Sequence, residues 1–214
     1  MMDYAELIAE FKLPDAEAFL LNCQKYHALL EEANKTVNLT RIDSYDGFMI
    51  KHILDSLYIV KYFPFLSREC VNLADVGCGA GFPAVVLAMA FPNLRVTAID
   101  SIGKKVRFVE AVKQAVNLTN LTAVQGRSRE MGYKAEWQSK FQVITARAVG
   151  NGAVIYAEAV RLLAPGGKFI LYKTPHQALE ELPLMGNIKP SRKWHLTETF
   201  SLPQESGERT FMYF

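Results

Sequence analysis

The stretch that decides the fold reads Ala74-Asp75-Val76-Gly77-Cys78-Gly79-Ala80-Gly81-Phe82-Pro83. A short β-branched run leads into it from Val71, and an apolar run from Ala84 to Phe91 follows it. The alternating glycines let the backbone turn tightly and approach a ligand that a Cβ would exclude. A proline suits the first turn of a helix, where its missing N–H costs nothing. The stretch therefore predicts a strand, a glycine turn and a helix, with a ligand beyond the end of the strand.

Strand and helix patterns alternate along the chain after this unit. The predicted strands cover residues 71–76, 95–99, 121–125, 141–145 and 168–172. The predicted helices cover residues 83–90, 104–116 and 153–163, and a Pro165-Gly166-Gly167 turn precedes the last strand. Parallel strands need crossovers, which helices usually supply. The runs 194–202 and 208–214 predict an antiparallel edge pair, so we expect an α/β fold with an open, mostly parallel sheet.

The chain before Val71 has a different rhythm. An apolar stripe at helical spacing runs from Ala16 to Leu30, after a helix start at Pro14-Asp15. A second stripe runs from Ile50 to Tyr58 and closes before Pro64. We therefore expect an N-terminal helical cap over residues 1–70 and the sheet domain over residues 71–214.

Composition narrows the class of protein. Half of the 214 residues are hydrophobic and 21% are charged, which excludes wholesale disorder. No apolar run approaches the ~18 residues of a membrane helix, and the first residues are acidic, unlike a secretory signal. Three cysteines without a C-x-x-C pair favour neither a disulfide framework nor a metal site. We expect a cytoplasmic monomer without a metal; residues 71–214, with 17 basic against 11 acidic residues, are compatible with a polyanionic partner.

A carboxylate completes the ligand site that the glycines predict. Asp100 ends the second predicted strand, about 20 residues after Gly81, and is placed to accept both hydroxyls of an adenosine ribose. Two cofactors remain possible. Gly79, Gly81 and Ala84 satisfy the dinucleotide pattern G-x-G-x-x-A, whereas Asp75 with the three glycines gives acid-x-G-x-G-x-G, which is typical of S-adenosylmethionine enzymes.

Several separate motifs resemble one family, the RsmG (GidB) methyltransferases, over nearly the whole chain. The motifs are Asn38-Leu39-Thr40, His52-Ile53-Leu54-Asp55-Ser56-Leu57, the glycine stretch, Asp100-Ser101-Ile102-Gly103-Lys104-Lys105-Val106-Arg107-Phe108, Thr145-Ala146-Arg147-Ala148-Val149 and Gly207-Glu208-Arg209. The resemblance implies a seven-stranded, Rossmann-like sheet that binds S-adenosyl-L-methionine. It also implies methylation of guanine N7, at position 527, in 16S ribosomal RNA of the small subunit.

The resemblance further implies which residues hold the cofactor: Gly77, Gly79, Gly81, Phe82, Asp100, Ser128, Arg129 and Arg147. The family usually has Ala-Glu where this chain has Ser128-Arg129, so a contact there is expected from the backbone. It commonly has Lys-Gly where this chain has Lys173-Thr174. A different loop shape is therefore expected after the fifth strand.

The chemistry implied by the family needs no catalytic base. Guanine N7 presents an unprotonated lone pair, and no residue is assigned a catalytic role. The candidates for contact with RNA are Asn38, His52, Asp55, Arg147, Lys173 and Arg209. For His52 and Asp55 a local pair on a solvated helix face is an equal alternative, as is an edge-strand solubility role for Arg209. Two other functions stay open: an NAD-linked oxidoreductase, and a non-catalytic RNA-binding or ribosome-assembly factor on the same fold.

Overall fold

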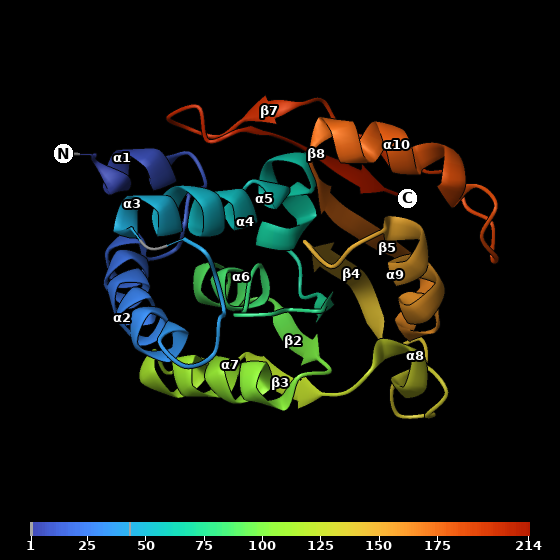
Figure 1. Ribbon diagram of the computed structural model, residues 1–214, viewed down its shortest axis with the longest axis horizontal. Helices are drawn as coiled ribbons and strands as arrows, with labels where there is room; N and C mark the ends of the chain where they lie inside the picture. The colour runs from blue at the N-terminus through green and yellow to red at the C-terminus, as the bar shows by residue number, and fades with distance from the viewer. Residues whose placement is uncertain (1, 43) are drawn as a thin grey trace.

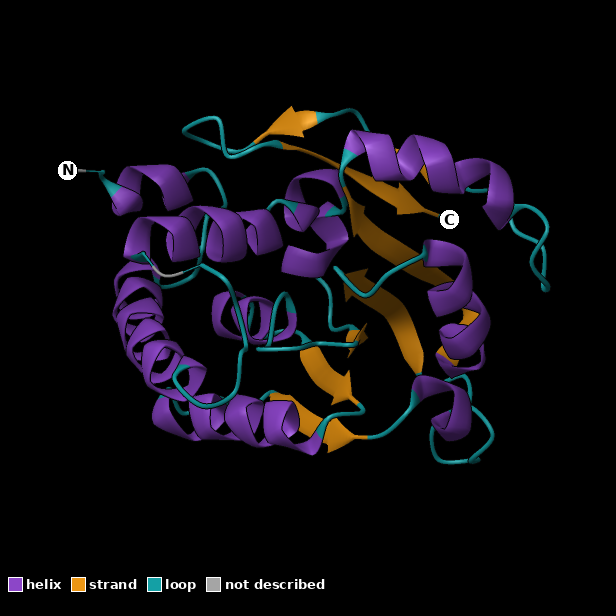
Figure 2. Ribbon diagram, viewed as in Figure 1, coloured by secondary structure: helices purple, strands orange, loops and turns teal. Residues whose placement is uncertain are grey.

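The computed structural model describes residues 2–42 and 44–214 and confirms an α/β fold around one mixed sheet (Figures 1 and 2). Five strands are parallel: β1 (Asn72–Val76), β2 (Arg95–Asp100), β3 (Leu121–Gln125), β4 (Phe141–Arg147) and β5 (Leu163–Lys173). Strand β8 (Glu208–Tyr213) is antiparallel to β5, and the order is β3-β2-β1-β4-β5-β8-β6. The chain leaves β1 toward β2 on one side and meets β4 on the other, which creates the switch point where such sheets bind ligands.

Helices cover both faces of the sheet. One face carries α6 (Ala84–Ala90) and α7 (Gly103–Ala115); the other carries α8 (Ser128–Met131), α9 (Gly152–Ala159) with the turn η3 (Val160–Leu162), and α10 (Pro175–Met185). Each face has its own apolar cluster, because strand side chains alternate between faces. Leu73, for example, belongs to the first cluster and Ala74 to the second.

The N-terminal cap packs on the α6–α7 side (Figure 1). Its elements are α1 (Tyr4–Ala9), α2 (Ala16–Asn34), α3 (Tyr45–Phe48), the π-helical turn η1 (Met49–Leu54), α4 (Asp55–Leu57), α5 (Ile59–Tyr62) and η2 (Pro64–Ser67). Buried side chains of the cap and of α6 belong to one apolar cluster. Because the two parts share this cluster, packing does not mark a division between them, and the domain boundary between residues 70 and 71 stays a prediction. No helix in the described part of the chain is both long and apolar enough to cross a bilayer.

The C-terminal part departs from the sequence prediction in three places. The strand expected over 194–202 is two short strands, β6 (His195–Leu196) and β7 (Phe200–Ser201). Between them the Thr197 hydroxyl accepts the backbone N–H of Phe211 at 2.9 Å, which interrupts regular pairing. Strand β5 begins at Leu163 and includes the expected 165–167 turn. Leu163 pairs with Phe141 and Lys168 with Val143, so the residues between them form an irregularity in the strand pairing. Helix α10 was not predicted, although Thr174 and Gln177 form a capping box at its start.

Candidate active site

The three glycines of the loop after β1 have different tasks. All three have positive φ, at +72°, +58° and +98° for Gly77, Gly79 and Gly81. A Cβ on Gly77 would lie 2.5 Å from Val149 Cγ1, and one on Gly81 would lie 2.4 Å from Val85 Cγ2. A Cβ on Gly79 would meet only the Gly77 carbonyl oxygen, at 4.0 Å. Gly77 and Gly81 thus allow close packing around the loop, whereas Gly79 leaves backbone open to a ligand.

Asp100 is fixed by the loop that it faces. Its Oδ2 accepts the N–H of Gly79 at 3.0 Å, and its Oδ1 accepts the N–H of Ile102 at 2.9 Å. The residue is 6% exposed and lines a cavity of about 740 Å³. Each carboxylate oxygen can accept more than one hydrogen bond. Asp100 therefore keeps acceptor capacity for a pair of ligand hydroxyls.

The cavity lies at the carboxyl ends of β1, β2, β3 and β4. Of the cofactor residues implied by the family, it is lined by Gly77, Asp100, Ser128 and Arg129. The other four do not line it: Gly79, Gly81, Phe82 and Arg147. Further lining residues that sequence reasoning missed are Ser101, Ile102, Arg127, Tyr133, Ala148 and Val149. Most of them directly follow a predicted strand end, and that position was the available signal.

Asp75 lies fully buried beneath the loop. Its Oδ1 accepts the Thr145 hydroxyl at 3.0 Å and its Oδ2 accepts the N–H of Ala84 at 3.3 Å. Burial raises the pKa of Asp75 to about 7, although these two hydrogen bonds and Arg147 oppose the shift. The carboxylate accepts a hydrogen bond from the first N–H of α6, at the helix end where a dinucleotide pyrophosphate would bind.

Asp75→Asn should make stability less dependent on pH. Because the pKa of Asp75 is raised in the folded state, its contribution is fully present below pH ~4 and is lost as pH rises through about 7. An amide can keep both hydrogen bonds, since the Thr145 hydroxyl can also accept. The Asn variant should unfold ~3 °C or more above the wild type at pH 8.5, and near it at pH 5. Thermal melts check this, with the exposed Glu205→Gln as control; an equal difference at both pH values would contradict it.

Arg147 ties the cap to the sheet. Its Nη1 donates to Asp55 Oδ2 and to the Lys51 carbonyl oxygen, both at 3.0 Å, and its Nη2 donates to His52 Nδ1 at 2.8 Å. The His52 ring stacks on Phe82 with centroids 4.1 Å apart, and the guanidinium lies 5.2 Å from the same ring. The end of β4, the π-helical turn and the glycine loop therefore form one connected unit.

His52 is held in its neutral form. An arginine can only donate, so Nδ1 is the acceptor and Nε2 carries the proton, which it donates to Thr40 Oγ1 at 2.9 Å. Burial, together with the neighbouring Arg147, lowers the pKa of His52 to about 3. Both ring nitrogens are engaged, so His52 has no free lone pair for a substrate proton.

Asp55 and Arg147, two of the predicted RNA contacts, form a buried ion pair, and their contact with RNA stays a prediction. The Asp55 side chain is only 4% exposed and lies between Arg147 and Arg209, whose Nε is 3.3 Å from its Oδ1. The solvated-face alternative is wrong, because Asp55 and Ser56 are buried. The apolar stripe with Ile53 and Leu57 is buried as well, so the segment is enclosed on both sides.

Lys173, another predicted RNA contact, is also buried and paired. Its side chain is 8% exposed and its Nζ pairs with Glu181 on α10 at 2.8 Å. Its contact with RNA stays a prediction. Asn38 is exposed on the loop after α2, and Arg209 is partly exposed on β8, so both remain predicted RNA contacts.

Two polar residues outside the predicted set organise the site. Asn34 Oδ1 accepts the N–H groups of Leu39 and Thr40 at 2.7 and 3.1 Å, which shapes the loop that carries Asn38. Thr40 then holds His52. Thr40 belongs to a motif quoted above, but Asn34 gave no signal beyond its place near the end of a helix.

Within residues 2–42 and 44–214, no three His, Cys, Asp or Glu side chains gather where a metal could bind.

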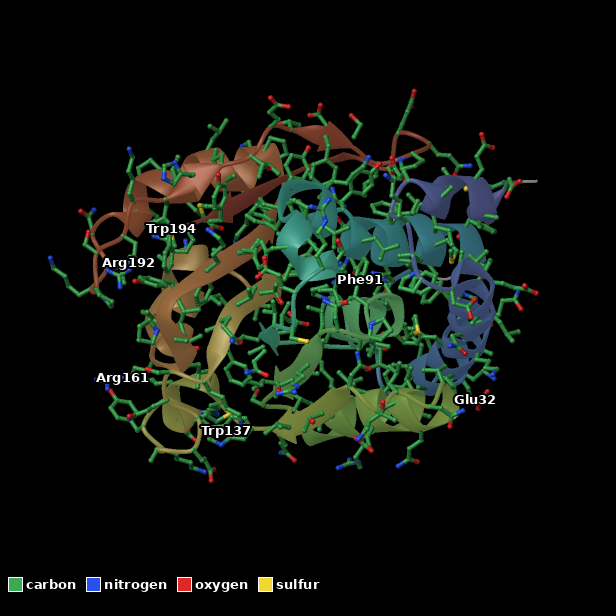
Figure 3. The ribbon with its side chains drawn as sticks, turned by 180° about the vertical axis from the view of Figure 1, so that it is seen from behind. Glu32, Phe91, Trp137, Arg161, Arg192 and Trp194 are labelled. Atoms are coloured by element: carbon green, nitrogen blue, oxygen red, sulfur yellow. The ribbon has the colours of Figure 1, made fainter. Side chains whose placement is uncertain are left out.

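Figure 3, seen from behind, has Phe91 in the interior beside the cap and Arg161 at the periphery near α8. Arg161 lies over the ring of Tyr133, at 4.4 Å, next to the cavity rim. The rim is therefore polar and carries charges of both signs on this side, with Arg127, Arg129, Glu130 and Glu158 exposed.

This chain is similar to known proteins in both sequence and fold. Ribosomal RNA small subunit methyltransferase G of Exiguobacterium sibiricum is 34% identical over an alignment of 216 residues. The alignment covers 98% of this chain and 87% of the relative. The Geobacillus kaustophilus protein of the same name is 36% identical over 197 residues, 91% of this chain and 81% of the relative. A SAM-dependent methyltransferase from Aquifex aeolicus superposes with a TM-score of 0.60 at 14% identity, over 82% of this chain and 95% of that one, and shows the fold. The family model for rRNA small subunit methyltransferase G matches residues 20–193, so the resemblance is confirmed and the chain belongs to this family.

Proposed function

We propose that this chain transfers a methyl group from S-adenosyl-L-methionine to N7 of guanine 527 in 16S ribosomal RNA. Family membership supports the rRNA substrate and the cofactor. The observation that carries the choice of N7 is the engagement of both His52 nitrogens beside the glycine loop. An amino-group acceptor would need a base to remove its proton, whereas N7 already offers a lone pair. We expect the protein to act as a monomer in the cytoplasm.

The residues around the cavity fit the cofactor. Asp100 would accept the ribose hydroxyls, Gly77 in the cavity wall would approach the methionine part, and Ser128 would close the adenine side. Arg129 is exposed and would contribute through its backbone. When bound, S-adenosylmethionine supplies an electrophilic methyl group on a sulfonium.

The task of the protein is alignment. In-line displacement depends on the angle and distance between nucleophile, carbon and leaving sulfur. The Arg147 hydrogen bonds fix the cap relative to the glycine loop, so they would set where a base that enters from the cap side meets the cofactor. Asn38 and Arg209, on the cap loop and β8, are the residues that we propose to contact RNA.

The oxidoreductase alternative fits the site poorly. A dinucleotide pyrophosphate uses the free N–H groups at the start of the helix after the glycine turn. In this chain the buried Asp75 carboxylate already accepts the first of them, from Ala84. An anion placed there would meet a carboxylate rather than an open helix end, which favours a cofactor without phosphate.

The proposal is tested by methyl transfer from labelled S-adenosylmethionine to 16S rRNA, both naked and in the small subunit. The modified nucleotide is located by borohydride reduction and aniline cleavage, which report N7-methylated guanine. Label at guanine 527 in one of these substrates is the expected result. Label on another atom overturns the N7 assignment. Binding of RNA without transfer would establish the non-catalytic assembly factor instead.

Single-turnover rates at saturating RNA and cofactor should be nearly flat between pH ~6.5 and ~8.5, because no proton has to be removed from N7. His52 stays neutral throughout this range, since its pKa is about 3. His52→Ala should lower the rate, because it releases Arg147, without changing the shape of the profile. The profile is also measured in Asp75→Asn, where the ionisation of Asp75 near pH 7 is removed. A tenfold rise per pH unit that His52→Ala abolishes would show that His52 is a base.

A further inference from the structure

Lys173 and Glu181 form a buried ion pair that the proposed reaction does not use. Lys173 is the last residue of β5, and Glu181 lies on α10, the helix that the sequence did not predict. The Lys173 Nζ lies 2.8 Å from Glu181 Oε2 and 2.9 Å from Oε1. Both side chains are largely buried. A pair so placed gives little net stability on its own, because removing two charges from water offsets their attraction.

Each member of the pair also holds the backbone of one loop. The loop covers residues 148–151, between β4 and α9. Lys173 Nζ donates to the Gly150 carbonyl oxygen at 2.9 Å, and the Gly152 N–H donates to Glu181 Oε2 at 2.6 Å. A Cβ on Gly152 would lie 2.7 Å from that Oε2, so a side chain there would push Glu181 away. The lysine thus holds Gly150 within the loop, and the glutamate holds Gly152, the first residue of α9 after the loop.

The same loop forms a wall of the cofactor cavity. Ala148 and Val149 line the cavity, and the Val149 side chain covers Gly77 so closely that a Cβ on Gly77 would clash with it. Ala148 has a φ of +55°, a conformation that costs a non-glycine residue energy and persists only where neighbours impose it. The two hydrogen bonds from the ion pair fix the backbone two and four residues further along, at Gly150 and Gly152.

We propose that Lys173 and Glu181 are positioning residues that hold the loop 148–151 in the shape required for the cofactor cavity. The inference rests on the proposed function only for the identity of the ligand. It differs from a purely structural role in one respect. An apolar pair of similar size would preserve the fold, but it would have no donor for Gly150 and no acceptor for Gly152.

The test uses the full chain with Lys173→Met/Glu181→Met. We expect its melting temperature to match or exceed that of the wild type, because no unpaired charge remains in the interior. Hydrogen exchange at the Gly152 amide, read from the peptide that spans β4 and α9, should become faster, because this N–H loses its acceptor on Glu181. Calorimetric titration with S-adenosylhomocysteine should show about tenfold weaker binding, since the loop must be ordered on binding.

The matched control is Glu180→Gln, one residue earlier on α10. Glu180 is 66% exposed and lies 3.4 Å from His176 on the surface. It should leave the exchange, the melting temperature and the affinity at wild-type values. If the double methionine variant does not fold, Lys173→Met/Glu181→Gln replaces it, because the glutamine oxygen can still accept from Gly152. That variant should leave the Gly152 amide closer to its wild-type exchange rate and weaken binding by a smaller factor.

The outcomes separate the inference from the proposed function. If S-adenosylhomocysteine does not bind the wild type, the cofactor assignment fails, while the exchange measurement still reports on the loop. If the wild type binds it and a folded variant shows unchanged exchange and affinity, the positioning role is overturned. Weaker binding together with unchanged loop exchange also overturns it, because the effect would then not pass through the loop.

Discussion

Arg147→Met should lower the free energy of unfolding by about 3–5 kcal/mol, as expected when one partner of a buried ion pair is removed. Asp55 would keep only Arg209 as a charged partner, at 3.3 Å, and would stay buried. His52 would lose the donor to its Nδ1. Urea unfolding measures the loss, and titration with S-adenosylhomocysteine shows whether the glycine loop is disturbed as well.

A double variant separates loss of the pair from loss of packing. Arg147→Met/Asp55→Asn removes the uncompensated carboxylate and should recover part of the stability. The exposed Arg68→Met serves as the control for loss of an arginine and should change stability by less than ~0.5 kcal/mol. An Arg147→Met protein as stable as the control would mean that the hydrogen bonds to the cap contribute nothing.

Asp100→Asn should weaken binding of S-adenosylhomocysteine by about 10- to 100-fold, or ~1–3 kcal/mol. The two carboxylate oxygens accept the N–H groups of Gly79 and Ile102. The amide of asparagine would direct a donor at one of these N–H groups, so the loop as well as the ribose contact would be disturbed. Calorimetric titration of the folded variant gives the affinity directly.

Glu158→Gln is the matched control for this prediction. Glu158 lines the same cavity, but it is exposed at the rim. Its neutralisation should change the affinity by less than about threefold. If Asp100→Asn binds as tightly as the wild type in a folded protein, Asp100 is not the carboxylate that accepts the ribose hydroxyls.

Local patterns carried the sequence predictions that the structure confirms. The glycine loop was readable because positive φ at three alternate positions favours glycine whatever the rest of the chain does. Strand β3 has the predicted bounds, Leu121–Gln125, and α7 begins one residue before the predicted helix. Asp100 was readable because the carboxyl ends of neighbouring parallel strands meet at one edge of the sheet.

Helix α10 was also within reach of the sequence. Thr174, Pro175 and Gln177 together carry the capping box and the N-terminal proline that begin a helix. The sequence analysis interpreted Lys173-Thr174 as a change of loop shape and predicted no helix after it, so Glu181 was not placed. The sequence therefore placed Lys173 near a strand end without its partner on α10.

The partners of the charged residues were decided by the tertiary structure alone. Arg147 meets Asp55 across 92 positions of sequence, where the end of β4 packs against the cap. Whether a lysine or an aspartate faces RNA or a buried partner depends on which elements pack over it, and packing brings together segments that share no local pattern. The sequence by itself determined the strand, turn and helix around the glycine loop and the type of residue at each strand end. The structure decided which charged side chains face the cavity and which form buried ion pairs, because a charge that packing removes from water needs a partner there.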